Sequence, residues 1–130
     1  MKKTILIAED ESHIQKMIAN RLKSHGYKVV TTDDGEEALE QITATKPDLI
    51  ILDLTMPKKN GYQVCNEVRA QSCFDNIPII ILSAWVRDKV GEDKALADVY
   101  ISKPFDPEQL MREVNHLITS GRDLIKPDVT

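Results

Sequence analysis

The sequence predicts one α/β domain built on a doubly wound parallel sheet, and three observations support this fold class. A chain of 130 residues with 42% hydrophobic content can bury one core but is too short for two ordinary domains. Five short apolar runs alternate with segments of helical periodicity, which predicts parallel strands joined by helices. The first, third and fourth runs are almost continuously aliphatic, which indicates strands covered by helices on both faces.

The five apolar runs are the predicted strands, and a helix is expected after each of them. The strands are expected at residues 4–8, 27–31, 49–52, 77–82 and 99–101. The first helix carries apolar residues at three- and four-residue spacing from Ile14 to Leu22, and it is predicted to end at His25-Gly26.

Caps and breakers place the remaining helices. The second is predicted to open at Gly35 and the third to follow Asn60-Gly61. The fifth is predicted to begin at Asp106-Pro107, a capping residue followed by a first-turn proline. The region between Val86 and Ala97 has a looser pattern with Gly91 inside it, so a short or mobile fourth helix is expected there.

The periodicity ends after Gly121, and this defines the expected domain. Residues 1–120 are predicted to form the domain, and residues 121–130 a tail or the start of a linker. A net charge of -4 with mixed signs offers no basic stripe, so direct nucleic-acid binding is not expected. Apolar runs too short to cross a bilayer and the lack of a signal-peptide core predict a cytoplasmic protein without membrane insertion.

Chemically active side chains follow four of the predicted strands. Glu9-Asp10 follows the first, Asp53 the third, Ser83 the fourth and Lys103 the fifth. In a five-stranded sheet of order 2-1-3-4-5, ligands bind at the carboxyl edge near the switch point between strands one and three. These side chains are therefore expected to converge on one site.

The residue types at this edge predict phosphoryl transfer. Three acids brought together need a cation or protonation, and oxygen ligands favour magnesium. Lys103 offers a compact positive charge for a phosphate oxygen, and Ser83 can donate a hydrogen bond. A carboxylate can itself accept a phosphoryl group, and Asp53 is the expected acceptor.

Four motifs make residues 3 to 120 resemble the receiver domain of two-component response regulators, the chemotaxis-regulator-like family. The motifs are Ile5-Leu6-Ile7-Ala8-Glu9-Asp10-Glu11, Asp53-Leu54-Thr55-Met56-Pro57 with Gly61, Leu82-Ser83-Ala84, and Tyr100-Ile101-Ser102-Lys103-Pro104-Phe105. The resemblance implies that Asp10, Asp53 and the Thr55 carbonyl hold Mg²⁺, with Mn²⁺ as an alternative ion. Glu9 would act directly or through water.

The same resemblance implies a conformational switch. Lys103 would clamp the phosphoryl group, and Ser83 would move toward it. Tyr100 would then swing inward and change the output face, which is the surface made by the fourth helix, the fifth strand and the fifth helix. Supporting positions within the same motifs are Pro57, Ala84 and Pro104. Trp85, two residues after Ser83, is a further supporting position but departs from the family pattern, and its bulky ring could sit at the mouth of the site. A cis bond is expected between Lys103 and Pro104. As a hypothesis, Trp85 and Thr55 shield the acyl phosphate from water.

The resemblance also implies partners. A histidine kinase or histidine phosphotransfer protein would supply the phosphoryl group, docking near Ile14 and the Pro104-Phe105 loop, and an unidentified protein would respond to it. The chain would catalyse only its own phosphorylation and dephosphorylation. We expect a stand-alone regulator; the alternatives are a receiver within a longer regulator that carries an effector domain, and a degenerate receiver that acts as a binding module.

The sequence departs from the family pattern around the predicted fourth helix. The stretch from Ser83 to Lys103 is about two residues shorter than is typical, in a region where loops vary most. Leu96 also stands where many members have glycine. Both departures bear on the output face.

Two other functions share parts of this pattern. A hydrolase of the haloacid-dehalogenase type needs a second Asp two positions after the nucleophile, where this chain has Thr55. A flavodoxin-type module shares the flavodoxin-like topology, but it binds phosphate with a hydroxyl- or glycine-rich loop after the first strand. Here Glu9-Asp10-Glu11 would repel a phosphate unless a metal intervened.

Overall fold

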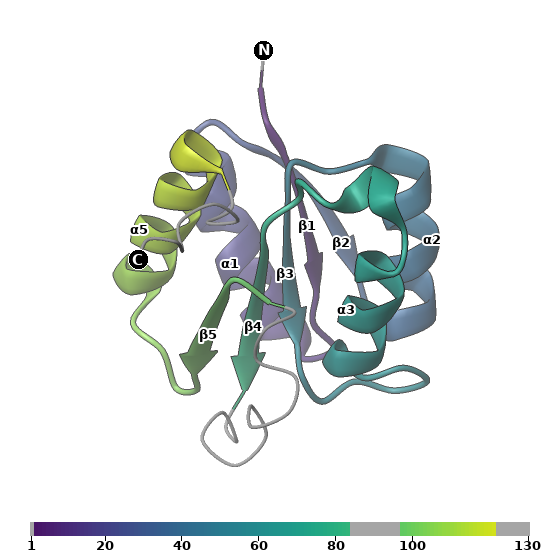
Figure 1. Cartoon of the computed structure of the whole chain (residues 1–130). Coiled ribbons are helices and arrows are strands. Elements are labelled where there is room, and N and C mark those ends of the chain that lie inside the picture. Colours follow the sequence, from purple (N-terminus) through teal and green to yellow (C-terminus); the bar gives the residue numbers. More distant parts are fainter. Residues whose placement is uncertain (1, 84–96, 122–130) are drawn as a thin grey trace, which may run out of the picture.

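The computed structural model describes residues 2–83 and 97–121, and these residues form one sheet of five parallel strands between helices (Figure 1). The strands lie in the order β2-β1-β3-β4-β5, and all four neighbouring pairs are parallel. Their bounds are β1 Thr4–Ala8, β2 Lys28–Thr32, β3 Leu49–Asp53, β4 Ile79–Ser83 and β5 Val99–Ser102. The predicted doubly wound sheet and its flavodoxin-like strand order are confirmed.

Four α-helices lie within the described residues, and local signals explain most of their ends. They are α1 (Ser12–Ser24), α2 (Gly35–Thr45), α3 (Gly61–Arg69) and α5 (Pro107–Ser120). Beyond α1, Gly26 adopts a φ of 92°, a conformation that glycine reaches without steric cost. The side chains of Asp34, Asn60 and Asp106 each accept a backbone N–H of the helix that follows. The predicted fourth helix between Val86 and Ala97 lies outside the described residues.

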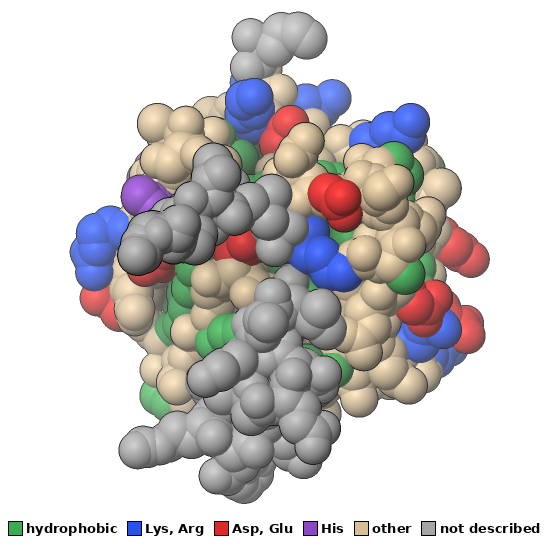
Figure 2. All heavy atoms as spheres, viewed as in Figure 1, with side chains coloured by type: hydrophobic (Ala, Val, Ile, Leu, Met, Phe, Trp, Pro, Cys, Tyr) green, Lys and Arg blue, Asp and Glu red, His purple; other side chains and the backbone are tan. Residues whose placement is uncertain are grey.

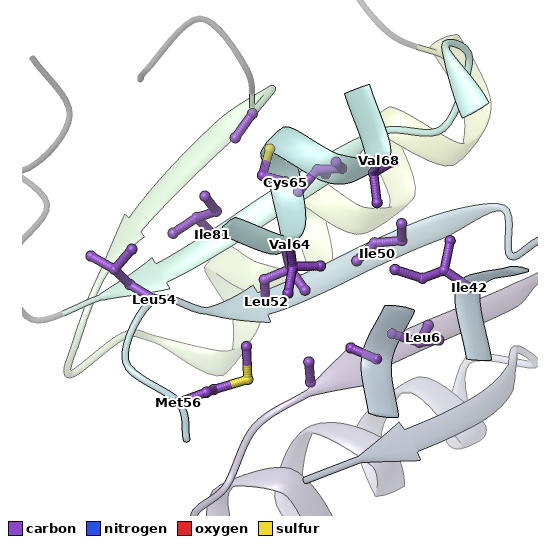
Figure 3. Packing of buried hydrophobic residues seen from close by; sticks show 14 of the residues in the cluster. Leu6, Ile42, Ile50, Leu52, Leu54, Met56, Val64, Cys65, Val68 and Ile81 are labelled. Atoms are coloured by element: carbon purple, nitrogen blue, oxygen red, sulfur yellow. The ribbon is translucent and has the colours of Figure 1, made fainter. Parts of the chain in front are cut away.

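The helices cover both faces of the sheet and enclose two apolar clusters. The first cluster packs α2 and α3 on one face, and its members include Ile42, Leu52 and Val64 (Figure 3). The second packs α1 and α5 on the other face, and it includes Leu22, Ile51 and Val114. Successive strand residues alternate between the clusters, so Ile50 and Leu52 face one and Leu49 and Ile51 the other. The aliphatic strands thus meet helices on both faces, as predicted.

The predicted beginnings of two strands were wrong, and hydrogen bonds explain both errors. Tyr27 was assigned to the second strand, but its N–H donates to the Leu22 carbonyl and completes the turn after α1. Ile77 was assigned to the fourth strand, but its N–H donates to Phe74 in a short 3₁₀ helix, Ser72–Phe74, that was not predicted. Pro78 has no N–H to donate, and β4 begins at Ile79.

The carboxyl ends of the strands reach one residue further than predicted at β2 to β5. The final residues Thr32, Asp53, Ser83 and Ser102 are all paired in register with neighbouring strands. In Figure 1 the arrowheads of the labelled strands lie at the same edge of the sheet. This edge is where the polar side chains predicted for the site begin.

The surface carries charges of both signs. On the face shown in Figure 2, acidic and basic side chains occur together rather than in one basic patch. Within residues 2–83 and 97–121, no helix is both long and apolar enough to cross a membrane.

Candidate functional site

Three carboxylates meet at the carboxyl edge of the sheet. Glu9 directly follows β1, Asp10 comes next, and Asp53 is the last residue of β3. One oxygen of each lies within 4.8 Å of the others. Glu9 is 0% exposed and Asp53 4% exposed, whereas Asp10 faces solvent. Two of the three acids are therefore buried, and such charges need a nearby cation.

Lys103 supplies that cation from the end of β5. Its Nζ lies 3.1 Å from Glu9 Oε1 and 3.2 Å from Asp53 Oδ2, with Glu11 Oε1 at 3.9 Å. Burial alone would lower the pKa of Lys103, but the charges of Asp53 and Glu9 and hydrogen bonds to both outweigh it and raise the pKa above its ordinary value. Lys103 is therefore a fixed positive charge between two buried carboxylates.

Glu9 is the perturbed acid of the cluster. Its pKa is raised from 4.5 to about 7, first by burial and then by the charge of Asp53 and a hydrogen bond with it. The backbone N–H of Glu11 and the charge of Lys103 act in the opposite direction. The protonated form of Glu9 is therefore favoured more than in an ordinary glutamic acid, and a bound metal ion would oppose this by favouring the ionised form.

Backbone contacts hold Asp53 and the loop that follows it. Leu54 N–H donates to the Leu82 carbonyl at 2.8 Å, which extends the β3–β4 ladder past Asp53. Thr55 N–H donates to Asp53 Oδ1 at 3.3 Å, while the Thr55 residue is exposed. Gly61 N–H returns to the Leu54 carbonyl at 2.8 Å, so the start of α3 lies directly against the end of β3.

The other predicted residues differ in how deeply they are buried. Ser83 is 2% exposed at the end of β4, and its carbonyl accepts the Lys103 N–H at 3.0 Å. Tyr100 is half-buried in β5 and packs against the first apolar cluster. Pro57 is exposed, and the predicted cis bond between Lys103 and Pro104 is confirmed.

Part of the predicted site lies outside the described residues. Ala84, Trp85 and Leu96 all fall between β4 and the described residues that lead into β5. The hypothesis that Trp85 shields an acyl phosphate therefore stays a prediction.

The donor set of this edge fits a hard divalent cation. The carboxylates of Glu9, Asp10 and Asp53 offer only oxygen atoms, and their mutual distances allow one ion to contact all three. Oxygen-only ligands are those that Mg²⁺ prefers. Glu9 and Asp53 also contact Lys103, so the cluster can hold a negatively charged group between a metal ion and an ammonium group.

Two contributors were missed by sequence reasoning. Glu11 lies 3.9 Å from Lys103 and also donates its backbone N–H to Glu9 Oε2 at 3.2 Å. Gln15, one turn into α1, donates its side-chain amide to Glu9, Thr32 and Asp33. No motif marks Gln15, because two of its three acceptors are backbone carbonyls that every residue possesses.

An apolar groove opens beside the acidic cluster. It has a volume of about 430 Å³ and is lined by Glu11, Ile14, Met17, Lys103, Pro104 and Phe105. Ile14 and Phe105 were the two residues predicted to contact a phosphodonor. The groove thus runs from the face of α1 to the loop after β5 and reaches Lys103.

The comparisons with known proteins agree on one family. The family model for the response regulator receiver domain matches residues 5–115. The probable transcriptional regulator ycf27 of Guillardia theta is 42% identical over 92% of this chain and 52% of its own length. The chain spans about half the length of such curated relatives.

Solved structures indicate the same family, and two of them contain magnesium. The receiver domain of a sensor histidine kinase from Pseudomonas aeruginosa, with a magnesium ion coordinated in the active site cleft, has a TM-score of 0.84 and 32% identity. The alignment of the two structures covers 92% of this chain and 100% of the Pseudomonas domain. The response regulator TrrA of Thermotoga maritima, in complex with Mg²⁺-BeF, has a TM-score of 0.81, 33% identity and coverage of 90% and 99%.

Proposed function

Because this chain belongs to the response regulator receiver domains of two-component systems, we propose that it accepts a phosphoryl group on Asp53 from a histidine kinase or a histidine phosphotransfer protein. The observation that carries the proposal is the position of Asp53. Its carboxylate is almost fully buried, lies 3.2 Å from the Lys103 ammonium group, and sits with Glu9 and Asp10 in one oxygen cluster.

The proposed step is a displacement at phosphorus. An Asp53 carboxylate oxygen forms the new O–P bond, and the P–N bond of the donor's phosphohistidine breaks, leaving its electron pair on the imidazole nitrogen. Lys103 Nζ, now between Asp53 and Glu9, binds an oxygen of the transferred group and offsets its charge. The chain then acts on itself alone, by accepting and later losing this group.

Magnesium is the proposed cofactor, with Mn²⁺ as an alternative. The carboxylates of Asp10 and Asp53 and the Thr55 carbonyl would hold it, and Glu9 would act directly or through water. Its charge would neutralise oxygens of the phosphoryl group. The magnesium named for the Pseudomonas and Thermotoga structures supports this assignment.

The groove lined by Ile14, Met17 and Phe105 is the proposed docking surface of the phosphodonor. It ends at Lys103, so a donor seated there brings its histidine near Asp53. Output is proposed to pass through Ser83, which is buried beside the site, and Tyr100, which lies on the neighbouring strand. A downstream protein would recognise the resulting change, without direct contact to nucleic acid.

The setting of the domain has two proposed forms. A stand-alone regulator would act by contact alone. The relatives named transcriptional regulators are about twice as long as this chain, which favours a receiver joined to an effector domain. Either form uses the same phosphoryl chemistry, whereas a degenerate receiver would use none of it.

Phosphorylation by a small donor tests the proposal. The protein is incubated with acetyl phosphate and Mg²⁺, and its intact mass is measured beside the Asp53→Asn variant and an EDTA control. We expect the mass of one phosphoryl group on the wild type only, and only with Mg²⁺. No added mass, with the fold intact, would leave the degenerate receiver as the better description.

A further inference from the structure

We propose that Gln15 is a positioning residue for the Glu9–Asp10 pair and thereby for the binding of the metal ion. The inference rests on the proposed function, because it concerns the same carboxylates. Gln15 lies on α1 and carries no charge, and it was not among the residues predicted for the site.

Three acceptors surround the Gln15 amide nitrogen. Gln15 Nε2 lies 2.9 Å from the Glu9 carbonyl oxygen, 3.0 Å from the Thr32 carbonyl oxygen and 2.9 Å from Asp33 Oδ1, so one of its two hydrogens is shared between two acceptors. Backbone carbonyls can only accept, so the nitrogen and not the oxygen of the amide must face them. One side chain therefore joins α1 to the ends of both β1 and β2.

The bond to Glu9 fixes the orientation of the peptide that leads to Asp10. The Glu9 carbonyl belongs to the peptide unit shared with Asp10, and this unit is planar. The Glu9 N–H donates to the Thr32 carbonyl at 3.1 Å, and the Glu9 carbonyl accepts from Gln15. The backbone N–H and the backbone carbonyl of Glu9 are therefore both hydrogen-bonded. Asp10 itself is exposed, and the direction of its carboxylate depends on this backbone.

The neutral amide suits this role. A lysine or arginine could make similar bonds, but its positive charge would compete with a metal ion for nearby carboxylates. Gln15 donates without adding charge, so it can orient the acidic turn and leave its negative potential intact. Partners that orient metal ligands typically change metal affinity by about 10- to 100-fold when they are removed.

Gln15→Met tests the proposal, because methionine keeps the length of the side chain and cannot donate. Mg²⁺ binding to the full chain is measured by calorimetry, and stability by urea unfolding in EDTA. We expect the Mg²⁺ Kd to rise about tenfold or more. Gln71→Met is the matched control, because it makes the same substitution at a glutamine beyond the end of α3, whose side-chain amide donates to the Glu67 carbonyl at 3.4 Å. Its Kd should stay within about twofold of the wild type, inside the scatter expected of hydrogen bonds that do not touch the ligands.

Gln15→Glu separates positioning from charge. The added negative charge alone would tighten Mg²⁺ binding, whereas loss of the donor should weaken it, and we expect weaker binding. An unchanged Kd in Gln15→Met, tighter binding in Gln15→Glu, or equal weakening in Gln71→Met would each overturn the proposal for Gln15 while the proposed function stands. A wild type that binds no Mg²⁺ would overturn both.

Discussion

The ammonium group of Lys103 is the charge that allows two carboxylates to be buried side by side. Its side chain is 17% exposed and contacts Glu9 and Asp53 at 3.1 and 3.2 Å. Removing one partner of a buried ion pair is costly, because the remaining charge loses its compensation. At this site the remaining charges would be two acids.

We therefore predict that Lys103→Met lowers the free energy of unfolding by about 3 kcal/mol in EDTA at pH 8. Phosphorylation by acetyl phosphate should slow by about 100-fold, while Mg²⁺ binding is retained because a competing cation has gone. Urea unfolding and intact mass measure these effects. Lys59→Met removes a surface lysine that pairs with Glu67, and it should change the free energy of unfolding far less than Lys103→Met does. If the two variants had the same free energy of unfolding and the same phosphorylation rate, the role given to Lys103 would be contradicted.

Glu9 makes the metal-free protein sensitive to pH. Folding raises its pKa from 4.5 to about 7, so the folded state binds a proton that the unfolded state releases. The stability from this group is therefore complete below pH 4.5 and is lost as the pH rises through 7. The loss is on the order of 3 kcal/mol.

To test this prediction, the free energy of unfolding of the wild type and of Glu9→Gln is measured from pH 5 to 8 in EDTA. In the difference between the two proteins, the titration of other groups cancels to about a few tenths of a kcal/mol. Glu9→Gln should gain stability relative to the wild type as the pH rises. With Mg²⁺ the ionised carboxylate is favoured, so metal binding should tighten with pH and release a proton. A difference that is flat with pH would disprove the raised pKa of Glu9.

At the scale of elements, α3 and the end of β3 are packed without space for a side chain. A Cβ on Gly61 would lie 2.7 Å from the Asp53 carbonyl oxygen and 2.9 Å from Leu54 Cα. Both are backbone atoms and cannot rotate away. The first turn of α3 therefore limits where Asp53 can sit.

Gly61→Ala should lower stability by about 2 kcal/mol and also slow phosphorylation, because the strand end that carries Asp53 must shift. Asn60→Ala is the comparison, since it removes the cap of the same helix and should cost about 1 kcal/mol. Its phosphorylation rate should match that of the wild type. If both variants phosphorylate normally, the packing of Gly61 does not control the acceptor.

The elements also show what the sequence could and could not predict. Aliphatic runs and caps such as Asn60 and Asp106 are local signals, and they placed the strands and the four described helices. The starts of β2 and β4 were misplaced because Tyr27 and Ile77 are apolar yet bond to preceding turns. Composition does not show which carbonyl an N–H will reach.

For the site too, some features follow from the sequence pattern and others depend on contacts that only the folded chain makes. Parallel strands bring their carboxyl ends together, so the meeting of Glu9, Asp53 and Lys103 followed from topology. Gln15 could not be found in this way, because its role depends on the distance from α1 to backbone groups of two strands. Such contacts require the folded structure.

At the scale of the whole molecule, the site is assembled from separate strands and exists only when the sheet is complete. Mg²⁺ should therefore stabilise the domain as a unit, by about 1.4 kcal/mol at ten times its Kd. Thermal unfolding with and without Mg²⁺ measures this shift as one transition. Asp10→Asn changes an exposed side chain and should leave metal-free stability unaltered while abolishing the shift. Stabilisation of that variant to the same degree would place the ion elsewhere.

The central claim is that Asp53 carries the phosphoryl group, and identifying the modified residue tests it most directly. The protein is treated with acetyl phosphate and Mg²⁺ and then reduced with borohydride, which converts an aspartyl phosphate to homoserine. Tandem mass spectrometry of the resulting peptides locates the change. We predict homoserine at position 53 alone, and none after Asp53→Asn or in EDTA. Homoserine at another acid, or a stable phosphoryl group on a hydroxyl side chain, would contradict the account.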